Sequence, residues 1–282
     1  MSSMVSVILC TYNAENYIRA TLESILCQSY TTIEILILDN NSKDITVEII
    51  KSYKDIRIHL YPSEKNLGPY GGLNFLLEKA TGDYIAIQDH DDLWHPQKLA
   101  KQIAFLDKNH RYIWCGTKTL MRYEWDQMWF EYYLWKENYY TIHPSLVFRN
   151  NKHYRYPETV YMNDALFQKK ILCKWEKLIY NIDQAITMHR VRDGASNYSY
   201  KWYKLTLKNL KTVIGLHPLW YVISTTLFEL MRKIVYPFLY RLKFGYLIDK
   251  IERVPYRLQG YKVRKYTKKD IDNLFLLDKW LV

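Results

Sequence analysis

Residues 5–28 read VSVILCTYNAENYIRATLESILCQ and join a short apolar run to a segment of helical periodicity. The run from Val5 to Cys10 is rich in β-branched residues, which is typical of a buried strand. Between Glu15 and Gln28 the apolar residues recur at helical spacing, at Ile18, Leu22, Ile25 and Leu26. The stretch therefore predicts a strand followed by a helix that packs on it.

The same alternation continues through the first 110 residues. Further strands are expected at Ile33–Leu38, Ile56–Tyr61 and Tyr84–Gln88, and further helices at Thr46–Tyr53, Gly71–Ala80 and Pro96–Leu106. Four strand–helix units predict an α/β fold with a mostly parallel, Rossmann-like sheet and helices on both faces.

The alternation ends near Tyr112, where irregular strands with many aromatic residues begin. A helix is expected from Asp164 to about Trp175, and a strand from Ala185 to Arg190. After Ser199 the chain reads as amphipathic helices interrupted by prolines. We expect a domain over residues 1–199, with a second half from about residue 111, and a basic, aromatic, helical C-terminal region over residues 200–282.

The net charge of +11 lies in the C-terminal region. Residues 201–282 contain 17 Lys and Arg against 6 Asp and Glu, whereas residues 1–200 contain 23 of each. A neutral body argues against nucleic acid as a partner, and a basic aromatic tail is typical of docking on an anionic membrane surface. The alternatives are a solvated helical face, packing on the body, or a homo-oligomer formed through these helices.

The cysteines and the apolar segments bear on the compartment. Cys10, Cys27, Cys115 and Cys173 show neither metal-ligand spacing nor a disulfide framework, so buried free thiols and a reducing compartment are expected. Because no basic or apolar leader-length run is seen ahead of the first strand, no secretory signal is expected. Residues 213–228 are the most apolar part of the tail but are shorter than the roughly 20 residues of a membrane span. We expect a cytoplasmic protein, either free or peripheral at the inner face of a membrane.

Polar residues follow each of the first four predicted strands. They are Thr11-Tyr12-Asn13, Asp39-Asn40-Asn41-Ser42, Asn66-Leu67-Gly68 and Asp89-His90-Asp91-Asp92. Ligands of an open parallel sheet bind beyond the carboxyl ends of its strands, so these four groups are expected to line one crevice. Taken singly, the second and third groups are also compatible with a turn or a helix cap.

The cluster from Asp89 to Asp92 predicts a metal site. Three carboxylates within four residues repel one another unless a cation compensates them. Oxygen ligands suit Mg²⁺ or Mn²⁺, which fill their remaining positions with phosphate oxygens and water. Neither G-x-G-x-x-G nor a P-loop motif follows the first strand, which argues against dehydrogenases and P-loop enzymes. A metal-neutralised nucleotide diphosphate is therefore the expected ligand.

Over about residues 4–197 the chain resembles glycosyltransferase family 2, whose members have the GT-A-type nucleotide-diphospho-sugar fold. The motifs that carry the resemblance occur in the family's order: the opening strand Val5–Asn13, the first helix Leu22–Gln28, the second-strand signature Asp39–Asp44, the donor loop Asn66–Gly68 and the D-x-D motif Asp89-x-Asp91.

The resemblance implies roles for individual residues. It implies donor contacts by Thr11, Tyr12, Asn13, Asp39, Asn66, Gly68 and Asp89, with Tyr12 and Asp39 on the base and Asp89 near the ribose and metal. Asp91 would be the direct metal ligand and Asp92 would orient the loop. His90 stands where the family more often has a small residue, so it is expected either to contact a donor oxygen or to face solvent.

The resemblance also implies an acceptor-side base and a phosphate-binding arginine. Inverting transfer needs a carboxylate that takes the proton of the attacking hydroxyl. Asp164 stands where the family has the second member of a Glu-Asp pair, although Asn163 replaces the first member and a helix-capping role is the alternative. The segment around Arg190 and Arg192 resembles one near the donor phosphates, and either guanidinium could bind diphosphate.

The expected function is inverting transfer of a sugar from a UDP or dTDP sugar to a hydroxyl of a glycan, glycolipid or glycoprotein, assisted by Mn²⁺ or Mg²⁺. About residues 1–110 would bind the nucleotide sugar and residues 111–199 would form the acceptor side. One alternative is a sugar nucleotidyltransferase, which usually has a glycine-rich basic loop where this chain has Thr11-Tyr12-Asn13. Another is a non-catalytic, membrane-associated scaffold with a degenerate nucleotide-sugar fold.

Overall fold

The protein is described by a computed structural model, which gives residues 2–123, 129–132, 137–138, 141–157, 164, 167–168 and 178–191. The expected helix Asp164–Trp175 falls mostly outside these residues, and the expected C-terminal appendage, residues 200–282, falls wholly outside them. In the part that is described, no helix has the length and apolar character of a membrane span.

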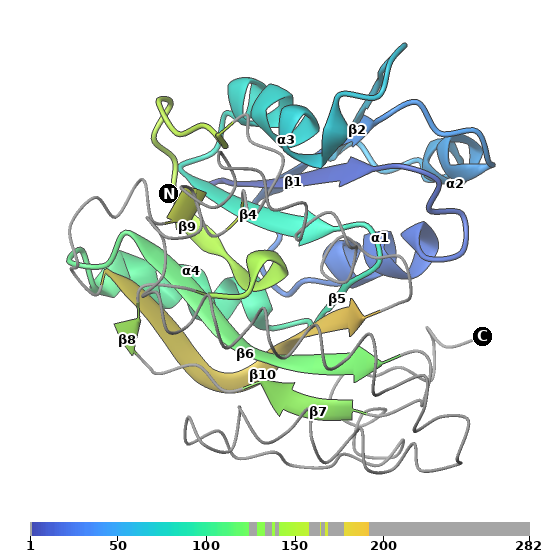
Figure 1. Ribbon diagram of the computed structural model, residues 1–282. Helices are drawn as coiled ribbons and strands as arrows, with labels where there is room; N and C mark the ends of the chain where they lie inside the picture. The colour runs from blue at the N-terminus through green and yellow to red at the C-terminus, as the bar shows by residue number, and fades with distance from the viewer. Residues whose placement is uncertain are drawn as a thin grey trace, which may run out of the picture. The chain divides into compact units, whose positions relative to one another are not determined.

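The first half is built from alternating strands and helices, as expected. The strands are β1 (Val5–Thr11), β2 (Ile33–Asp39), β3 (Ile58–Pro62) and β4 (Tyr84–Asp89), and the helices are α1 (Ile18–Leu26), α2 (Thr46–Ser52), α3 (Gly68–Lys79) and α4 (Lys98–Lys108). All four strands run parallel in the order β3-β2-β1-β4 (Figure 1). This confirms the predicted α/β sheet.

The second half continues the same sheet with mixed directions. Its elements are β5 (Leu93–Trp94), β6 (Trp114–Tyr123), β7 (Trp129–Tyr132), β8 (Glu137–Asn138), the 3₁₀ turn η1 (His143–Ser145), β9 (Val147–Arg149) and β10 (Ile179–Val191). β9 lies antiparallel between β4 and β6, and β10 runs parallel to β6 and antiparallel to β5. β9 therefore joins the second half of the fold to the parallel strands.

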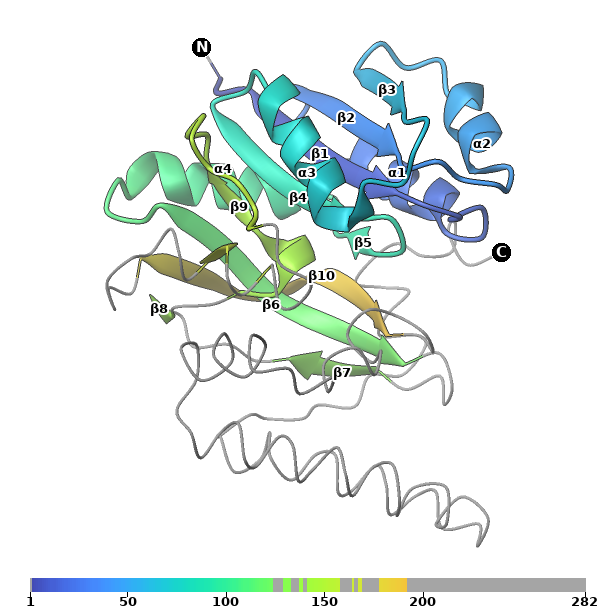
Figure 2. The same cartoon turned by 45° about the horizontal axis from the view of Figure 1, so that its top comes forward.

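Two hydrophobic cores cover the two faces of the sheet. One lies under α1, α2 and α4 and includes Leu22, Ile50 and Ile103; the other lies under α3 and includes Leu76 and a group of aromatic side chains, namely Trp114, Phe148, Tyr156 and Phe167. Figure 2 shows α3 on the opposite side of the sheet from α1 and α4. The buried strands carry apolar side chains on both faces, as expected of a parallel sheet.

Helix boundaries differ from the sequence-based expectation at the amino ends. α1 begins at Ile18 rather than Glu15, because Ala14 to Tyr17 form a turn in which the Ala14 carbonyl accepts from the backbone N–H groups of Tyr17 and Ile18. α3 begins at Gly68, three residues before the expected start, with Pro69 in its first turn. Proline suits that position, since its missing N–H would have no partner there.

The expectation that the cysteines are buried free thiols holds in part. Cys115 is buried and Cys10 is half-buried, whereas Cys27 is exposed; all three are free. Cys27 is the C-cap residue, directly after the last residue of α1. Burial raises the pKa of the Cys10 thiol to about 12, with a smaller contribution from Asp89, so Cys10 stays a neutral thiol. Cys173 lies outside the described residues.

Helix α3 packs so closely on the sheet that Gly72 has no room for a side chain. A Cβ there would lie 2.4 Å from Cys10 Sγ and 2.7 Å from Leu38 Cδ2. We expect Gly72→Ala to lower the free energy of unfolding by about 1–3 kcal/mol, the usual range for overpacking. Gly71→Ala is the matched control in the same helix, because its Cβ would meet only Leu67 Cβ at 3.2 Å. Equal urea midpoints for the two variants would contradict the close packing.

Candidate active site

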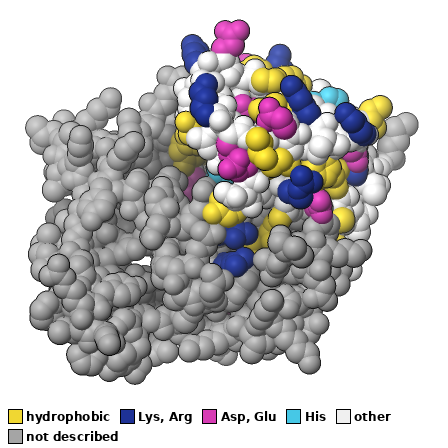
Figure 3. Space-filling view, turned by 90° about the vertical axis from the view of Figure 1, so that its right-hand side faces the viewer, with side chains coloured by type: hydrophobic (Ala, Val, Ile, Leu, Met, Phe, Trp, Pro, Cys, Tyr) yellow, Lys and Arg dark blue, Asp and Glu magenta, His cyan; other side chains and the backbone are white. Residues whose placement is uncertain are grey.

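The polar residues predicted to converge do lie together at the carboxyl ends of the parallel strands. Thr11 is paired with Asp39 across β1 and β2, and Cys10 is paired with Asp89 across β1 and β4. Figure 3 looks toward this edge of the sheet, where acidic and basic side chains are interspersed on the described part of the surface. The strand register therefore places the ends of β1, β2 and β4 side by side.

The loops after β1 and β2 hold each other in place. Asn13 has a φ of 47° and Asn41 a φ of 69°, in the left-handed region that asparagine tolerates better than most residues. The Asn13 backbone N–H donates to Ser42 Oγ at 2.9 Å, and Asn13 Oδ1 accepts from the Lys43 backbone N–H at 2.8 Å. Asn13 therefore ties the loop after β1 to the loop after β2 through its backbone N–H and its side-chain oxygen, while Tyr12 beside it is 42% exposed.

Asp39 and Thr11 have buried side-chain oxygens at the ends of β2 and β1. Asp39 Oδ2 accepts from the Ser42 backbone N–H at 3.0 Å. In the described part of the chain, neither Asp39 Oδ1 nor Thr11 Oγ1 has a hydrogen-bond partner, although both atoms are buried. A buried oxygen without a partner carries a desolvation cost of about 1–3 kcal/mol, so these two atoms are suited to hydrogen bonding with a ligand.

The loop before α3 is tied to the end of β2 by two asparagines. Asn40 Nδ2 donates to Asn66 Oδ1 at 3.0 Å, and the Leu67 backbone N–H donates to Asn40 Oδ1 at 2.7 Å. Asn66 Oδ1 also accepts from the Gly68 backbone N–H at 2.8 Å, and Gly68 has a φ of 73°. The predicted donor loop is thus placed beside Asp39, with the Asn66 side chain exposed at its edge.

Asp89, at the end of β4, contacts His143, a residue to which no sequence motif assigns a role. His143 Nδ1 lies 3.2 Å from Asp89 Oδ1, and His143 Nε2 lies 2.8 Å from the Tyr156 hydroxyl. Burial disfavours the charged forms of Asp89 and His143, but the attraction between the carboxylate and the imidazolium outweighs this effect. The pKa of Asp89 is therefore held below its usual value and the pKa of His143 is raised.

Asp92 is fully buried and holds the end of β10. Its Oδ1 accepts from the Arg190 backbone N–H at 2.7 Å, and its Oδ2 lies 2.8 Å from His189 Nδ1. Burial disfavours the imidazolium, but the Asp92 carboxylate outweighs this and raises the pKa of His189 to about 9. This placement fits the expected role of Asp92 in orienting the loop.

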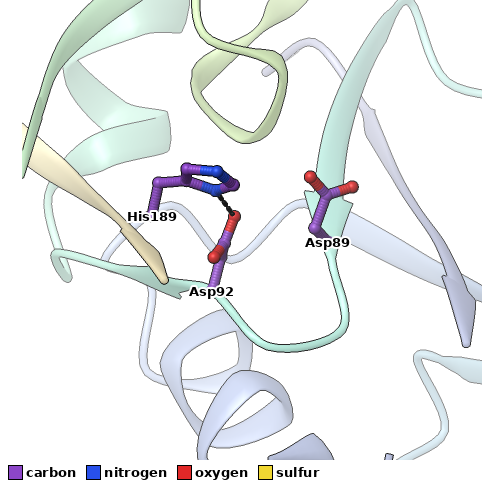
Figure 4. Close-up of side chains that lie close together, drawn as sticks. All are labelled: Asp89, Asp92 and His189. Atoms are coloured by element: carbon purple, nitrogen blue, oxygen red, sulfur yellow. Dashed lines mark hydrogen bonds and ion pairs between the residues drawn. The ribbon is translucent and has the colours of Figure 1, made fainter. Parts of the chain in front are cut away.

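One set of side chains in the described residues has the composition and spacing of a cation site. A carboxylate oxygen from each of Asp89 and Asp92 and a ring nitrogen of His189 all lie within 4.8 Å of one another. Figure 4 shows the His189 ring hydrogen-bonded to Asp92, with the Asp89 carboxylate across the gap. Oxygen and imidazole ligands suit Mn²⁺, so the residues present fit such an ion.

The other residues of the acidic motif occupy different positions. Asp91, the predicted direct ligand, is 8% exposed and is not a member of this set among the residues described. His90 is half-buried, and its carbonyl accepts from Thr21 Oγ1 at 2.9 Å. Both assignments stay predictions.

Of the two arginines predicted near the donor phosphates, Arg190 is buried beside the acidic loop. Its Nε donates to the Asp91 carbonyl at 3.0 Å, and its guanidinium lies 4.9 Å from the ring centre of Tyr17. These contacts hold the loop that carries the acidic motif. Arg192 lies outside the described residues.

Asp164, the predicted base, lies near the same group of side chains. It has helical conformation, is half-buried and interacts electrostatically with His143. Burial, together with the carboxylates of Asp164 and Asp89, raises the pKa of Tyr70 well above its usual value, and the Tyr70 hydroxyl accepts from the Asp164 backbone N–H. The structure thus places Asp164 within the electrostatic reach of the Asp89–His143 pair.

Two contacts of the site, His143 and His189, were given no role by the sequence. His189 lies in the segment that resembles the phosphate-binding region, but the resemblance assigns roles there only to the arginines. His143 is followed by proline and serine without a recognisable motif. The only sequence feature that could have indicated His143 is its position just before a short apolar run.

We expect Asp92→Ala to destabilise the protein strongly. The change would remove the hydrogen bonds that the buried Asp92 carboxylate accepts from the His189 ring and from the Arg190 backbone N–H, at a cost of about 3–5 kcal/mol. Glu78→Ala is the matched control, because Glu78 forms an exposed ion pair with Arg155 worth about 0–1 kcal/mol. Urea denaturation gives the free energy of unfolding of both variants. A similarly small decrease in the two would contradict the structural role of Asp92.

Comparisons with solved structures agree with the fold. A structure of residues 1–349 of S. aureus TarS in complex with UDP-GlcNAc superposes with a TM-score of 0.59 at 23% identity, covering 70% of this chain and 61% of that one. A mannosyltransferase from Pyrobaculum calidifontis, in complex with GDP-Man and Mn²⁺, gives a TM-score of 0.55 at 18% identity, covering 69% and 59%. At these identities the likeness shows the GT-A-type fold alone.

Sequence relatives are closer but match only part of the chain. A putative glycosyltransferase, EpsE of Bacillus subtilis, is 44% identical over 120 residues, which are 42% of this chain and 43% of that protein. The Escherichia coli protein WfaP, a UDP-Glc:α-D-GlcNAc-diphosphoundecaprenol β-1,3-glucosyltransferase, is 42% identical over 104 residues, covering 37% and 41%. The chain thus spans less than half the length of these two relatives.

The family model described as glycosyl transferase family 2 matches residues 6–170, more than half of the chain. The matched segment contains Asp39, Asp89 and Asp164. This protein belongs to glycosyl transferase family 2.

Proposed function

We propose that this protein is an inverting glycosyltransferase that moves a sugar from a UDP sugar to a hydroxyl of a glycan or glycolipid. The observation that carries the proposal is the row of Thr11, Asp39 and Asp89 at adjacent strand ends, with two buried oxygens that lack partners among the described residues. Asp39 Oδ1 would accept from an N–H of the base, and the exposed ring of Tyr12 would stack on it.

The proposed diphosphate site lies beyond β4. Asp89 and His189 Nε2 would hold Mn²⁺ or Mg²⁺, and the Asp92 carboxylate on Nδ1 would keep the imidazole in position, as is usual for metal-bound histidine. Asp91 remains the ligand that the D-x-D motif predicts. A bound divalent ion would supply positive charge for the diphosphate as it leaves. We propose that Arg192 contacts the phosphates. Arg190 would support the loop that carries the acidic motif.

Asp164 is proposed as the general base. Its carboxylate would accept the proton of the acceptor hydroxyl as that oxygen bonds to the anomeric carbon. The bond from the anomeric carbon to the diphosphate oxygen would break on the opposite face, releasing UDP and inverting the configuration. The proximity of Asp164 to Tyr70 and His143 supports this role, because both interact electrostatically with Asp89.

A UDP sugar is preferred over a dTDP sugar on the basis of relatives. WfaP and WfgD of Escherichia coli are described as glucosyltransferases that use UDP-Glc and a GlcNAc-diphosphoundecaprenol acceptor. A lipid-linked acceptor would also explain a basic, aromatic region at residues 200–282, which we propose to lie on the inner face of a membrane. Synthesis of a surface polysaccharide is the process that fits such an acceptor.

Thermal stabilisation by nucleotide sugars tests the proposal. With Mn²⁺ present, UDP-Glc, UDP-GlcNAc, dTDP-Glc and GDP-Man would be compared at equal concentrations. A ligand at 100 times its Kd stabilises the folded state by about 2.7 kcal/mol, and we expect this shift for a uridine donor alone. A stronger shift with dTDP-Glc would reassign the base, and no shift with any donor would favour a non-catalytic scaffold.

A further inference from the structure

The imidazole of His143 bridges the donor side and the acceptor side of the site. Its Nδ1 lies 3.2 Å from Asp89 Oδ1 and 3.4 Å from Asp89 Oδ2, so it contacts both oxygens of that carboxylate. Its Nε2 lies 2.8 Å from the Tyr156 hydroxyl. Each ring nitrogen therefore has a partner, and the ring cannot flip without losing one or both contacts.

The turn that carries His143 is held by side chains from two other elements. Trp94 Nε1 donates to the Pro144 carbonyl at 2.9 Å, and Gln102 Nε2 donates to the Ser145 carbonyl at 2.8 Å. Trp94 and Gln102 are buried. Because both of the carbonyls that follow His143 are fixed, the imidazole has a defined position even though it lies in a three-residue turn.

Tyr156 fixes the far side of the ring. It is 2% exposed and stacks on Phe167 with ring centres 4.0 Å apart. Its backbone is tied to α3, since Asn74 Oδ1 accepts from the Tyr156 N–H at 2.7 Å and Asn74 Nδ2 donates to its carbonyl at 3.1 Å. The hydroxyl that meets His143 Nε2 is thus anchored in the aromatic core rather than in a loose side chain.

The hydrogen-bond partner of His143 Nδ1 determines whether that nitrogen carries a proton. An ionised carboxylate can only accept, so the proton must lie on Nδ1. Asp89 itself is 34% exposed at the end of β4, which leaves part of the carboxylate open to a ligand. His143 therefore restricts the rotation of the Asp89 carboxylate without covering it.

We propose that His143 is a positioning residue that sets the orientation of the Asp89 carboxylate for the divalent ion and the donor. The inference rests on the proposed function of Asp89. Tyr70, whose ring centre lies 6.3 Å from that of His143, adds a contact from the first turn of α3. The imidazole thereby ties the orientation of a donor-side carboxylate to the turn that precedes β9.

Three variants test this role: His143→Leu, His143→Asn and Tyr156→Phe. His143→Leu removes the donor to Asp89, and we expect Mn²⁺ affinity in the presence of UDP to fall about 10-fold to 100-fold, as for other residues that orient metal ligands. His143→Asn places an amide N–H near the position of Nδ1 and should restore much of the affinity. Tyr156→Phe keeps the contact with Asp89 and should cost less than His143→Leu.

Electron paramagnetic resonance of Mn²⁺ provides the affinities, and thermal denaturation of each variant controls for folding. Unchanged Mn²⁺ affinity in a folded His143→Leu, or equal losses in the leucine and asparagine variants, would overturn the inference. These affinities are measured without sugar transfer, so they test the role of His143 separately from catalysis. If the variants show the predicted order of Mn²⁺ affinities but the wild-type protein transfers no sugar, the proposed function alone is refuted.

The geometry can also be tested without metal or nucleotide. In ¹⁵N NMR of histidine side chains, His143 should show a protonated, hydrogen-bonded Nδ1, and Asp89→Asn should shift that signal more than Asp83→Asn, which changes an exposed carboxylate elsewhere. Equal responses to the two substitutions would show that His143 and Asp89 are not paired in solution.

Discussion

Replacing Asp164 with alanine is expected to reduce sugar transfer by about 10²-fold to 10⁴-fold, the usual contribution of a general base. Asp164 interacts with Tyr70 and His143, whereas the base of the nucleotide is expected at the Thr11–Asp39 end of the site. Affinity for the UDP sugar should therefore stay within about twofold of wild type. Initial rates of UDP release in the presence of acceptor measure sugar transfer, and calorimetry measures the affinity for the UDP sugar.

Two further variants sharpen this prediction. Asp164→Asn keeps the shape of the side chain and removes its basicity, so it should be as slow as the alanine variant. Asp183→Ala removes an exposed carboxylate on β10 that pairs with Lys118, and it should retain nearly full activity. Transfer by Asp164→Asn at a rate close to wild type would refute the assignment of the base.

The second large effect is expected from Asp89→Ala. Asp89 lies at the end of β4, beside His143 and in the set of potential metal ligands. Its loss should remove several kcal/mol of stabilisation from the departing diphosphate, which corresponds to about 10³-fold in rate. Donor hydrolysis measured over a range of Mn²⁺ concentrations tests this, because the loss of a metal ligand should also raise the Mn²⁺ concentration needed for half-maximal rate.

The same titration distinguishes the two proposed partners of Asp89. If His189 completes the site, His189→Gln should weaken Mn²⁺ binding more than Asp91→Asn, because Asp91 is not grouped with these ligands among the residues described. The D-x-D motif predicts the reverse order. Asp89→Ala with unchanged Mn²⁺ dependence would refute both versions.

The first half of the fold could be predicted from sequence because each element carries its own signal. β1 and α1 differ in apolar period, and similar segments recur through α4. The short elements β5 and β9 could not be predicted in this way. β5 is a strand because it pairs with β10, and β9 is a strand because it pairs with β4 and β6. Segments of two or three residues are too short to show a hydrophobic period that would predict such pairing.

The same distinction applies to the site. Asp39 and Asp89 were identifiable because each lies at the carboxyl end of an apolar strand, and the topology of parallel sheets brings such ends together. His143 and His189 meet Asp89 and Asp92 from positions 54 and 97 residues further along the chain. Those contacts depend on how the second half of the sheet folds back on the first, which the sequence pattern does not reveal.

The most direct test of inverting, metal-assisted transfer is the anomeric configuration of the sugar first released from a UDP sugar. In the absence of acceptor, slow hydrolysis of UDP-Glc with Mn²⁺ can be followed by ¹H NMR before mutarotation. The donor has the α configuration, so we predict that β-glucose appears first and that chelation of Mn²⁺ stops its release. Initial formation of α-glucose, or release at the same rate without a divalent ion, would contradict the proposed mechanism.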